Sequence, residues 1–154
     1  MGRTVRRLGL TNVEMLQGDS RELPALVKER ADLVLVDAPC SGLGTLRRNP
    51  ELRWRRLPGD IPGFARLQLS LLEAAAEVVR PGGTLVYSVC TYTREETVDV
   101  LEAFLSRRDD YTSRDLSAFL PHPYGIAVTA SGYAQLMPHL HGCEGMFMAR
   151  IERT

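Results

Sequence analysis

The stretch ADLVLVDAPC, residues 31–40, decides the fold class of this chain. Its first eight residues are apolar on both faces of a strand, which is typical of a buried strand in a parallel sheet. Three residues suited to chemistry, Asp37, Pro39 and Cys40, lie where this strand ends. Because ligands bind at the carboxyl ends of the strands in such sheets, we expect this junction to carry a functional site.

Strand and helix patterns alternate through the rest of the chain, which predicts an α/β fold with a parallel sheet flanked by helices. The predicted strands are 13–19, 31–38 and 84–90, and the predicted helices are 22–30, 64–80 and 93–108. Thr93 and Glu96 stand at the positions of a capping box for the last helix. Residues 133–142 and 145–152 are predicted to form an antiparallel pair at a sheet edge. We expect all 154 residues to form one domain.

The composition argues against several classes of protein. The net charge is zero at pH 7, so a nucleic-acid partner must be held by a local patch. No apolar run reaches the length of a membrane span, and the N-terminus is too polar for a signal peptide. Three irregularly spaced cysteines without a Cys-x-x-Cys pair argue against a disulfide framework or a zinc site. We therefore expect a reducing cytoplasm as the setting.

Two cysteines, Cys40 and Cys90, follow predicted neighbouring strands. A lone cysteine is usually a small buried apolar residue, but two at the same edge of a sheet suggest chemistry. Cys90 also precedes the predicted helix 93–108, whose positive end favours a thiolate, and a thiolate is an able nucleophile. Cys143 lies near two histidines, but too few ligands stand at metal spacing, so we interpret it as structural.

Two aspartates at predicted strand ends have different alternatives. Asp19 is as well suited to capping the helix that begins near Glu22 as to binding a ligand. Asp37 is harder to explain as a cap, because no predicted helix starts directly after it.

Arginines cluster around a single tryptophan in the loop that follows Cys40. This pattern fits a solvated loop, but it also fits a clamp for a nucleic-acid backbone with an aromatic side chain for base stacking. The members are Arg47, Arg48, Arg53, Trp54, Arg55 and Arg56.

Four segments together resemble a known family, the RNA cytosine-C5 methyltransferases of the RsmB/Nop2/Sun type. They are RRLGLTNVEMLQGD, DAPCSGLGTLRRNPELRW, GGTLVYSVCTYTREE and QLMPHLHGCEGMFMARI. The resemblance implies a Rossmann-like class I methyltransferase sheet, truncated at the N-terminus, in which the first two strands and the glycine-rich loop are absent. Residues 1–154 would then be part of a catalytic domain, and a preceding segment or another chain would complete the sheet.

The resemblance also implies a mechanism and a role for each site residue. Cys90 would add to C6 of a cytosine in rRNA or tRNA, Cys40 would assist release of the product, and Asp37 would hydrogen-bond the base. The cofactor would be S-adenosyl-L-methionine, contacted by Asp19, Asp37 and Pro39. The RNA backbone would be held by Arg47, Arg48 and Arg53. No metal is implied.

Three other functions stay open at this stage. In a DNA cytosine-C5 methyltransferase the Pro-Cys thiol would attack, but the second cysteine, Cys90, and the arginines after Cys40 argue against that reading. A non-catalytic fragment that binds RNA or a partner is compatible with the absent glycine-rich loop. A nicotinamide-binding domain is disfavoured because Gly-x-Gly-x-x-Gly is lacking.

Overall fold

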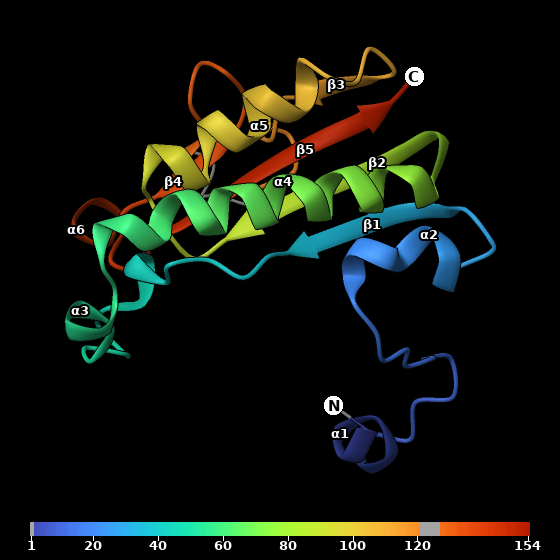
Figure 1. The fold of residues 1–154 in the computed structure, drawn as a ribbon, viewed down its shortest axis with the longest axis horizontal. Helices are drawn as coiled ribbons and strands as arrows, with labels where there is room; N and C mark the ends of the chain where they lie inside the picture. Colours follow the sequence, from blue (N-terminus) through green and yellow to red (C-terminus); the bar gives the residue numbers. More distant parts are fainter. Residues whose placement is uncertain (1, 121–126) are drawn as a thin grey trace.

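A computed structural model describes residues 2–120 and 127–154 of the chain. Its strands form one mixed sheet in the order β1-β2-β5-β3, and β4 pairs with β5 (Figure 1). The strands are β1 (Ala31–Asp37), β2 (Val79–Val89), β3 (Tyr111–Arg114), β4 (Ala134–Leu136) and β5 (Met146–Arg153). The helices are α1 (Gly2–Arg7), α2 (Leu23–Leu26), α3 (Leu52–Arg55), α4 (Ile61–Val78), α5 (Val98–Leu105) and α6 (Pro138–His141). The predicted α/β class is confirmed.

The strand directions explain where a site can form. β1 and β2 are parallel, so their carboxyl ends leave the sheet side by side. β5 runs antiparallel to β2, β3 and β4. The predicted antiparallel pairing of the two C-terminal segments is confirmed by β4 and β5, but β5 lies inside the sheet rather than at its edge. The short strand β3 was not predicted, because YTSR has too few apolar residues for a strand pattern.

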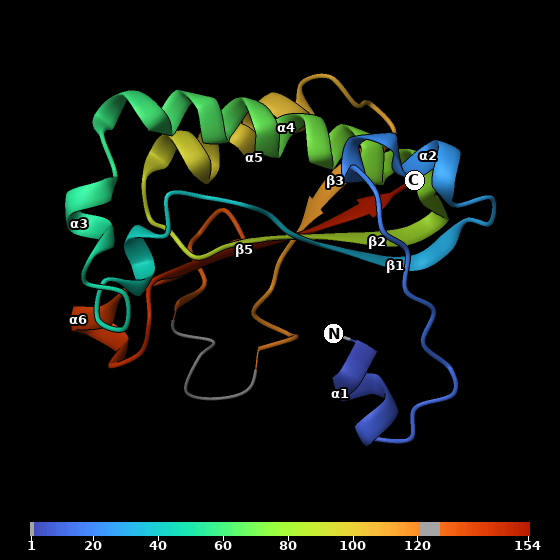
Figure 2. The same cartoon turned by 60° about the horizontal axis from the view of Figure 1, so that its bottom comes forward.

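The helices α2, α4 and α5 lie on one face of the sheet (Figure 2). The predicted helix 64–80 corresponds to α4, which begins earlier, at Ile61, with a proline in its first turn. Large side chains from α4, α5 and the central strands form the core, among them Leu72, Tyr87, Phe104, Phe147 and Ile151. The sheet and α4 thus form the rigid frame from which the loops after β1 and β2 emerge.

The expectation that β1 is buried on both faces is wrong. Val34 and Val36 pack against the core, whereas Leu33 and Leu35 are 61% and 62% exposed. These two leucines alternate with the buried valines, so they point to the face opposite α4. β1 is also an edge strand, with β2 as its partner among the described residues.

The predictions for the N-terminal part hold less well. Residues 13–19 form no strand, and Val13, Met15 and Leu16 are exposed. Figure 1 shows this segment and α1 away from the sheet, where none of the strands in the described part of the chain lies beside them to supply hydrogen bonds. The predicted helix 22–30 is reduced to a 3₁₀ turn (Ser20–Glu22) and α2, because the chain becomes extended at Val27.

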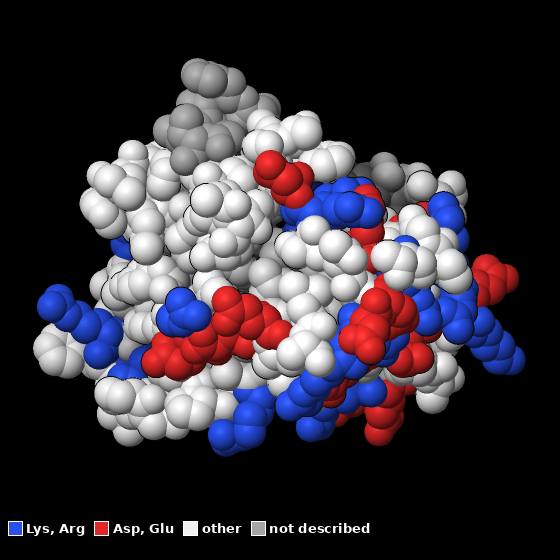
Figure 3. All heavy atoms as spheres, turned by 90° about the horizontal axis from the view of Figure 1, so that it is seen from above, with Lys and Arg blue, Asp and Glu red and all other residues white. Residues whose placement is uncertain are grey.

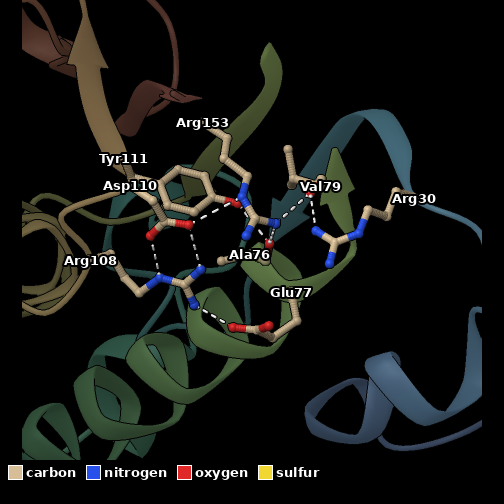
Figure 4. Close-up of polar contacts among 8 residues, drawn as sticks. All are labelled: Arg30, Ala76, Glu77, Val79, Arg108, Asp110, Tyr111 and Arg153. Atoms are coloured by element: carbon tan, nitrogen blue, oxygen red, sulfur yellow. Dashed lines mark hydrogen bonds and ion pairs between the residues drawn. The ribbon is translucent and has the colours of Figure 1, made fainter. Parts of the chain in front are cut away.

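The carboxyl end of α4 is held by basic and phenolic donors (Figure 4). Tyr111 Oη donates to the carbonyl of Ala76 at 2.7 Å, and Arg153 Nη1 donates to the carbonyl of Val79 at 2.8 Å. Cations are favourable here because the last carbonyls of a helix carry partial negative charge. The guanidinium of Arg108 contacts both Glu77 and Asp110, which ties α4 to the start of β3.

Charged side chains elsewhere balance one another. Figure 3 shows acidic and basic residues interspersed on the face that it draws. Examples are the pairs Arg94–Asp99 at 2.8 Å and Arg107–Glu73 at 2.7 Å. In the part of the chain that the structure describes, no helix is both long and apolar enough to cross a membrane.

Candidate active site

The parallel pairing of β1 and β2 brings the two cysteine loops together. Asp37 is level with Ser88 in the sheet, and the N–H of Ala38 donates to the carbonyl of Ser88 at 3.0 Å. Strand β1 ends at Asp37 and strand β2 at Val89, and Cys40 and Cys90 stand in the loops that directly follow these ends. The two Sγ atoms lie 3.3 Å apart, which is within hydrogen-bond distance for sulfur. The structure therefore joins the two cysteines that the sequence places fifty residues apart.

A glycine makes the close approach of the loops possible. Gly44 N–H donates to the carbonyl of Cys90 at 3.0 Å, and Gly145 N–H donates to the carbonyl of Gly44 at 2.8 Å. A Cβ at position 44 would stand 2.0 Å from the carbonyl oxygen of Gly145, which no side chain can occupy. The loop after Cys40 is thus fixed against both Cys90 and the loop before β5.

The environment distinguishes the two thiols. Burial, followed by the neighbouring Cys90, raises the pKa of the Cys40 thiol to about 12. At neutral pH Cys40 is therefore protonated and can donate its S–H to the sulfur of Cys90. A protonated neighbour that donates a hydrogen bond suits Cys90 to the part of the nucleophile.

A buried carboxyl group joins the segments around the thiols. Glu96 has no exposed surface, and its Oε1 accepts from the N–H of Ser41 at 2.7 Å and from Gln68 Nε2 at 3.1 Å. Its Oε2 accepts from the hydroxyl of Thr93 at 2.9 Å. The predicted capping box is therefore wrong: the Glu96 side chain turns into the interior to meet the loop after Cys40, and Thr93 makes no side-chain cap.

Asp37 and Pro39 line a hollow of about 280 Å³ at the end of β1. Both residues are exposed to it, and apolar residues from β1, α2 and α4 form its walls. These wall residues include Leu23, Val34, Val36, Leu71 and Ala75. A carboxylate at the rim of an apolar hollow suits a ligand with a flat apolar part and hydrogen-bond donors.

Asp19 caps the turn that begins at Ser20. Its carboxylate accepts from the backbone N–H of Arg21 at 2.9 Å and pairs with the Arg21 guanidinium. These contacts lower the pKa of Asp19 to about 2. Of the two alternatives from the sequence, the structure shows the cap; Ser20, beside Asp19, lines the hollow.

The arginine cluster divides into structural and exposed members. Arg56 Nε donates to the carbonyl of Ser41 at 2.9 Å, and its guanidinium stacks over the ring of Phe64. Arg48 lies 2.8 Å from Glu144, although its side chain is largely exposed. The remaining members, Arg47, Arg53 and Arg55, are exposed, as is Trp54, at 83%. The exposed members lie on and before α3, at the same end of the molecule as the cysteine loops (Figure 1).

Comparison with known families identifies the chain. The family model described as 16S rRNA methyltransferase RsmB/F matches residues 1–152. This chain belongs to that family. This match confirms the resemblance to the RsmB/Nop2/Sun type that the sequence motifs predicted, and it extends over almost the whole chain.

Curated relatives match almost all of this RsmB/F chain. It is 41% identical over 153 residues to the probable ribosomal RNA small subunit methyltransferase B of Synechocystis. It is 42% identical over 152 residues to ribosomal RNA small subunit methyltransferase B of Thermus thermophilus. These matches cover 98% and 99% of this chain but 34% and 36% of the two relatives. The RsmB/F chain thus spans about a third of their length.

Solved structures agree with the fold of this RsmB/F chain. The crystal structure of PH0851 has a TM-score of 0.90 and 37% identity, over 99% of this chain and 33% of that one. The structure of NSun6 from Pyrococcus horikoshii with SFG has a TM-score of 0.81 and 33% identity, over 99% and 38%. The predicted Rossmann-like methyltransferase fold is confirmed.

The sequence alone did not predict that two polar residues, Glu96 and Gln68, belong to the site. The sequence predicted that Glu96 caps the helix 93–108. Nothing in the residues around Glu96 indicates that its carboxyl group reaches Ser41. Gln68 offered a usable signal, because it lies on the apolar face of α4 in step with Leu71 and Leu72. A polar residue on a buried helical face needs hydrogen-bond partners, and Gln68 Nε2 finds them in Glu96 and in the carbonyl of Pro39, whereas Gln68 Oε1 has no partner among the described residues.

Proposed function

We propose that this chain carries the catalytic cysteines of a methyltransferase that modifies C5 of a cytosine in rRNA or tRNA, with S-adenosyl-L-methionine as the methyl donor. The observation that carries the proposal is the 3.3 Å approach of Cys40 and Cys90 at the carboxyl ends of two parallel strands. The names of the relatives, rRNA small subunit methyltransferases, support RNA as the substrate.

In the proposed reaction Cys90 is the nucleophile. Its thiolate adds to C6 of the cytosine, and the electron pair of the C5–C6 double bond then makes C5 nucleophilic. S-adenosyl-L-methionine would supply the methyl group: as the bond from C5 to the methyl carbon forms, the S–CH3 bond of the donor breaks and S-adenosyl-L-homocysteine leaves. The C5 proton then passes to solvent water, the electron pair of the C5–H bond re-forms the C5–C6 double bond, and the electron pair of the C6–S bond leaves with sulfur as the Cys90 thiolate.

Cys40 and Asp37 support this chemistry from either side. The S–H of Cys40 stabilises the Cys90 thiolate before addition and, at 3.3 Å, lies where it can assist release of the sulfur from C6. Asp37, exposed at the end of β1, hydrogen-bonds the N3/N4 edge of the base. The target base has to be unpaired or flipped out to reach these groups.

The hollow at the end of β1 fits the methyl donor. Its apolar walls suit the adenine ring, and Asp37 and Pro39 stand at its rim. Asp19 belongs to the same region through its neighbour Ser20, so we retain Asp19, Asp37 and Pro39 as the cofactor contacts of the proposal.

The exposed arginines are proposed to hold the RNA backbone. Within residues 2–120 and 127–154 neither Arg47 nor Arg53 forms an ion pair, and Arg48 would exchange Glu144 for a phosphate. A guanidinium grips phosphate with two hydrogen bonds, so each arginine can contribute separately. The free cysteines are compatible with our expectation of a cytoplasmic setting.

A chimera tests the proposal, since the chain spans about a third of its relatives. Residues 2–154 replace the matching segment of the Thermus thermophilus relative, and bisulfite sequencing of treated 16S rRNA locates any 5-methylcytosine. We expect methylation by the chimera, none with Cys90→Ala, and unchanged methylation with the control Cys143→Ala. Methylation that persists in Cys90→Ala would refute the assignment of the nucleophile.

Calorimetric titration of the 154-residue chain with S-adenosyl-L-methionine addresses the alternative function. Heat of binding, lost in Asp37→Ala, is expected if the hollow holds the donor. A chimera without methylation, together with no heat of binding, would favour a chain that binds RNA or a partner without catalysis.

A further inference from the structure

The carboxyl group of Glu96 connects both cysteine loops to the same point. Ser41, next to Cys40, donates its N–H to Oε1, and Thr93, three residues after Cys90, donates its hydroxyl to Oε2. The main-chain carbonyl of Glu96 accepts from the hydroxyl of Tyr87 on β2 at 2.7 Å. Glu96 itself is therefore fixed to the strand that leads to Cys90.

Gln68 extends this connection to helix α4. Its Nε2 donates both to Glu96 Oε1 at 3.1 Å and to the carbonyl of Pro39 at 2.9 Å. Pro39 immediately precedes Cys40, so the backbone on each side of this cysteine is held, by Gln68 before it and by Glu96 after it. The hydroxyls of Ser41 and Thr91 add a direct contact of 2.9 Å between the two loops.

The donors to this carboxyl are neutral. Among the described residues, those within hydrogen-bond distance of the Glu96 carboxyl are a backbone N–H, an amide and threonine hydroxyls, with no arginine, lysine or histidine. A carboxyl group buried without a cation is costly to the fold. The hydrogen bonds of this carboxyl group hold segments next to the two thiols, which points to a role in positioning these segments besides any effect on stability.

We propose that Glu96, with Gln68, is a positioning residue that sets the distance between the thiols of Cys40 and Cys90. Glu96 touches neither sulfur, so it acts through the backbone at Ser41 and through Thr93. The catalytic meaning of this inference rests on the proposed function, whereas the spacing of the thiols can be measured without any methyl transfer.

Phenylarsine oxide measures that spacing in the 154-residue chain with Cys143→Ser, which leaves only the pair. The reagent condenses with two adjacent thiols: two As–S bonds form, one water leaves, and no atom changes oxidation state. We expect Glu96→Ala to weaken binding by about tenfold, equivalent to about 1.4 kcal/mol. Glu96→Gln keeps an oxygen for the N–H of Ser41, so it should restore binding to within about threefold of the parent.

The matched control is Tyr111→Ala, at the opposite end of α4. Tyr111 is buried and packs against Phe104, so its loss destabilises the fold without touching the cysteine loops. It should leave arsenical binding unchanged. A folded Glu96→Ala chain that binds the reagent as tightly as the parent overturns the proposal.

A second variant decides the matter if Glu96→Ala does not fold. Gln68→Met keeps the volume of the side chain while removing both of its hydrogen bonds, and we expect about fivefold weaker arsenical binding. Unchanged binding by this folded variant would also overturn the proposal.

The chimera supplies the catalytic readout. There Glu96→Ala should lower kcat and leave the KM for RNA nearly unchanged, because the carboxyl group is buried and its hydrogen-bond partners among the described residues include none of the exposed arginines. An unsubstituted chimera without activity would count against the proposed function alone, since the arsenical series still decides whether Glu96 positions the thiols.

Discussion

The two ends of helix α4 are held in opposite ways. At the carboxyl end, arginines, acids and the phenol of Tyr111 form a partly exposed network around the carbonyls of Ala76 and Val79 (Figure 4). At the end near the thiols, Gln68 meets the buried carboxyl of Glu96, and the donors around it are neutral. The carboxyl end therefore combines charge pairs with the buried hydrogen bond of Tyr111, whereas the region near the thiols depends on hydrogen bonds from neutral donors to one buried carboxyl group.

This difference has a physical consequence for the site. Ion pairs with a partly exposed partner are weak and are screened by salt, so we expect the loss of one such charge at the carboxyl end of α4 to cost little. Buried hydrogen bonds to a carboxyl group are expensive to lose, because each donor left without a partner keeps its desolvation cost. Burial, followed by the neighbouring Cys90, raises the pKa of the Cys40 thiol in these surroundings.

The largest expected effect concerns the reactivity of Cys40. With a pKa of about 12, its thiol stays protonated through the range in which an ordinary cysteine ionises. At pH 9 we expect iodoacetamide to alkylate Cys40 at least about a hundredfold more slowly than an unfolded cysteine peptide. Its rate should still be rising with pH at pH 10, as followed by peptide mass spectrometry. A plateau near pH 9 would show that burial does not control this thiol.

The second largest effect is expected in the free energy of unfolding when the buried carboxyl group near the thiols is removed. Glu96→Ala removes the acceptor for Ser41, Gln68 and Thr93, and we expect a loss of about 3 kcal/mol in the free energy of unfolding. Urea denaturation followed by circular dichroism measures it. Because the group is buried, adding salt should change the loss little. A loss below about 0.5 kcal/mol would mean that water replaces the carboxyl group.

A smaller effect is expected at the other end. Asp110→Asn weakens the contacts with Arg108 and Arg153, but Asp110 is partly exposed, so the loss should be about 1 kcal/mol. The same denaturation experiment in high salt should reduce it further, in contrast to Glu96→Ala. Equal salt dependence of the two variants would remove the distinction between the ends.

The smallest effect concerns Asp19, outside the helix. Its low pKa follows from Arg21, so Arg21→Ala should raise it from about 2 toward the ordinary value, measurable by NMR titration. A lowered pKa stabilises the fold above the ordinary carboxyl pKa and ceases to do so as the pH falls toward 2. Because Asp19 is exposed, stability should change little. If the pKa of Asp19 stayed near 2 in the variant, the hydrogen bond from the backbone N–H at position 21, and not the guanidinium, would hold the carboxylate.

Sequence reasoning succeeded where a local pattern coincides with the topology. The apolar run before Asp37 marks β1, and the apolar run before Cys90 marks β2. Because neighbouring parallel strands end at the same edge of a sheet, the sequence could predict that Cys40 and Cys90 lie close together. It failed where packing decides. Leu33 and Leu35 look like core residues but lie on the exposed face of an edge strand, and none of the described strands pairs with the segment 13–19.

The hydrogen bonds that join the segments of the site were also not predicted from the sequence. Glu96 stands at a capping position, and local sequence cannot distinguish a cap from a carboxyl group that reaches across to Ser41. Such contacts depend on the packing of three segments from different parts of the chain. The polar residue Gln68 on the apolar face of α4 is the one sequence feature that could have predicted these buried hydrogen bonds.

The proposal that Cys90 attacks the base while Cys40 assists release has one direct test. The chimera carrying Cys40→Ser is incubated with 16S rRNA and S-adenosyl-L-methionine, and the products are run on a denaturing gel. We predict a protein–RNA adduct that accumulates and that peptide mapping places on Cys90. No adduct, or one attached to another residue, would contradict the assignment of the two thiols.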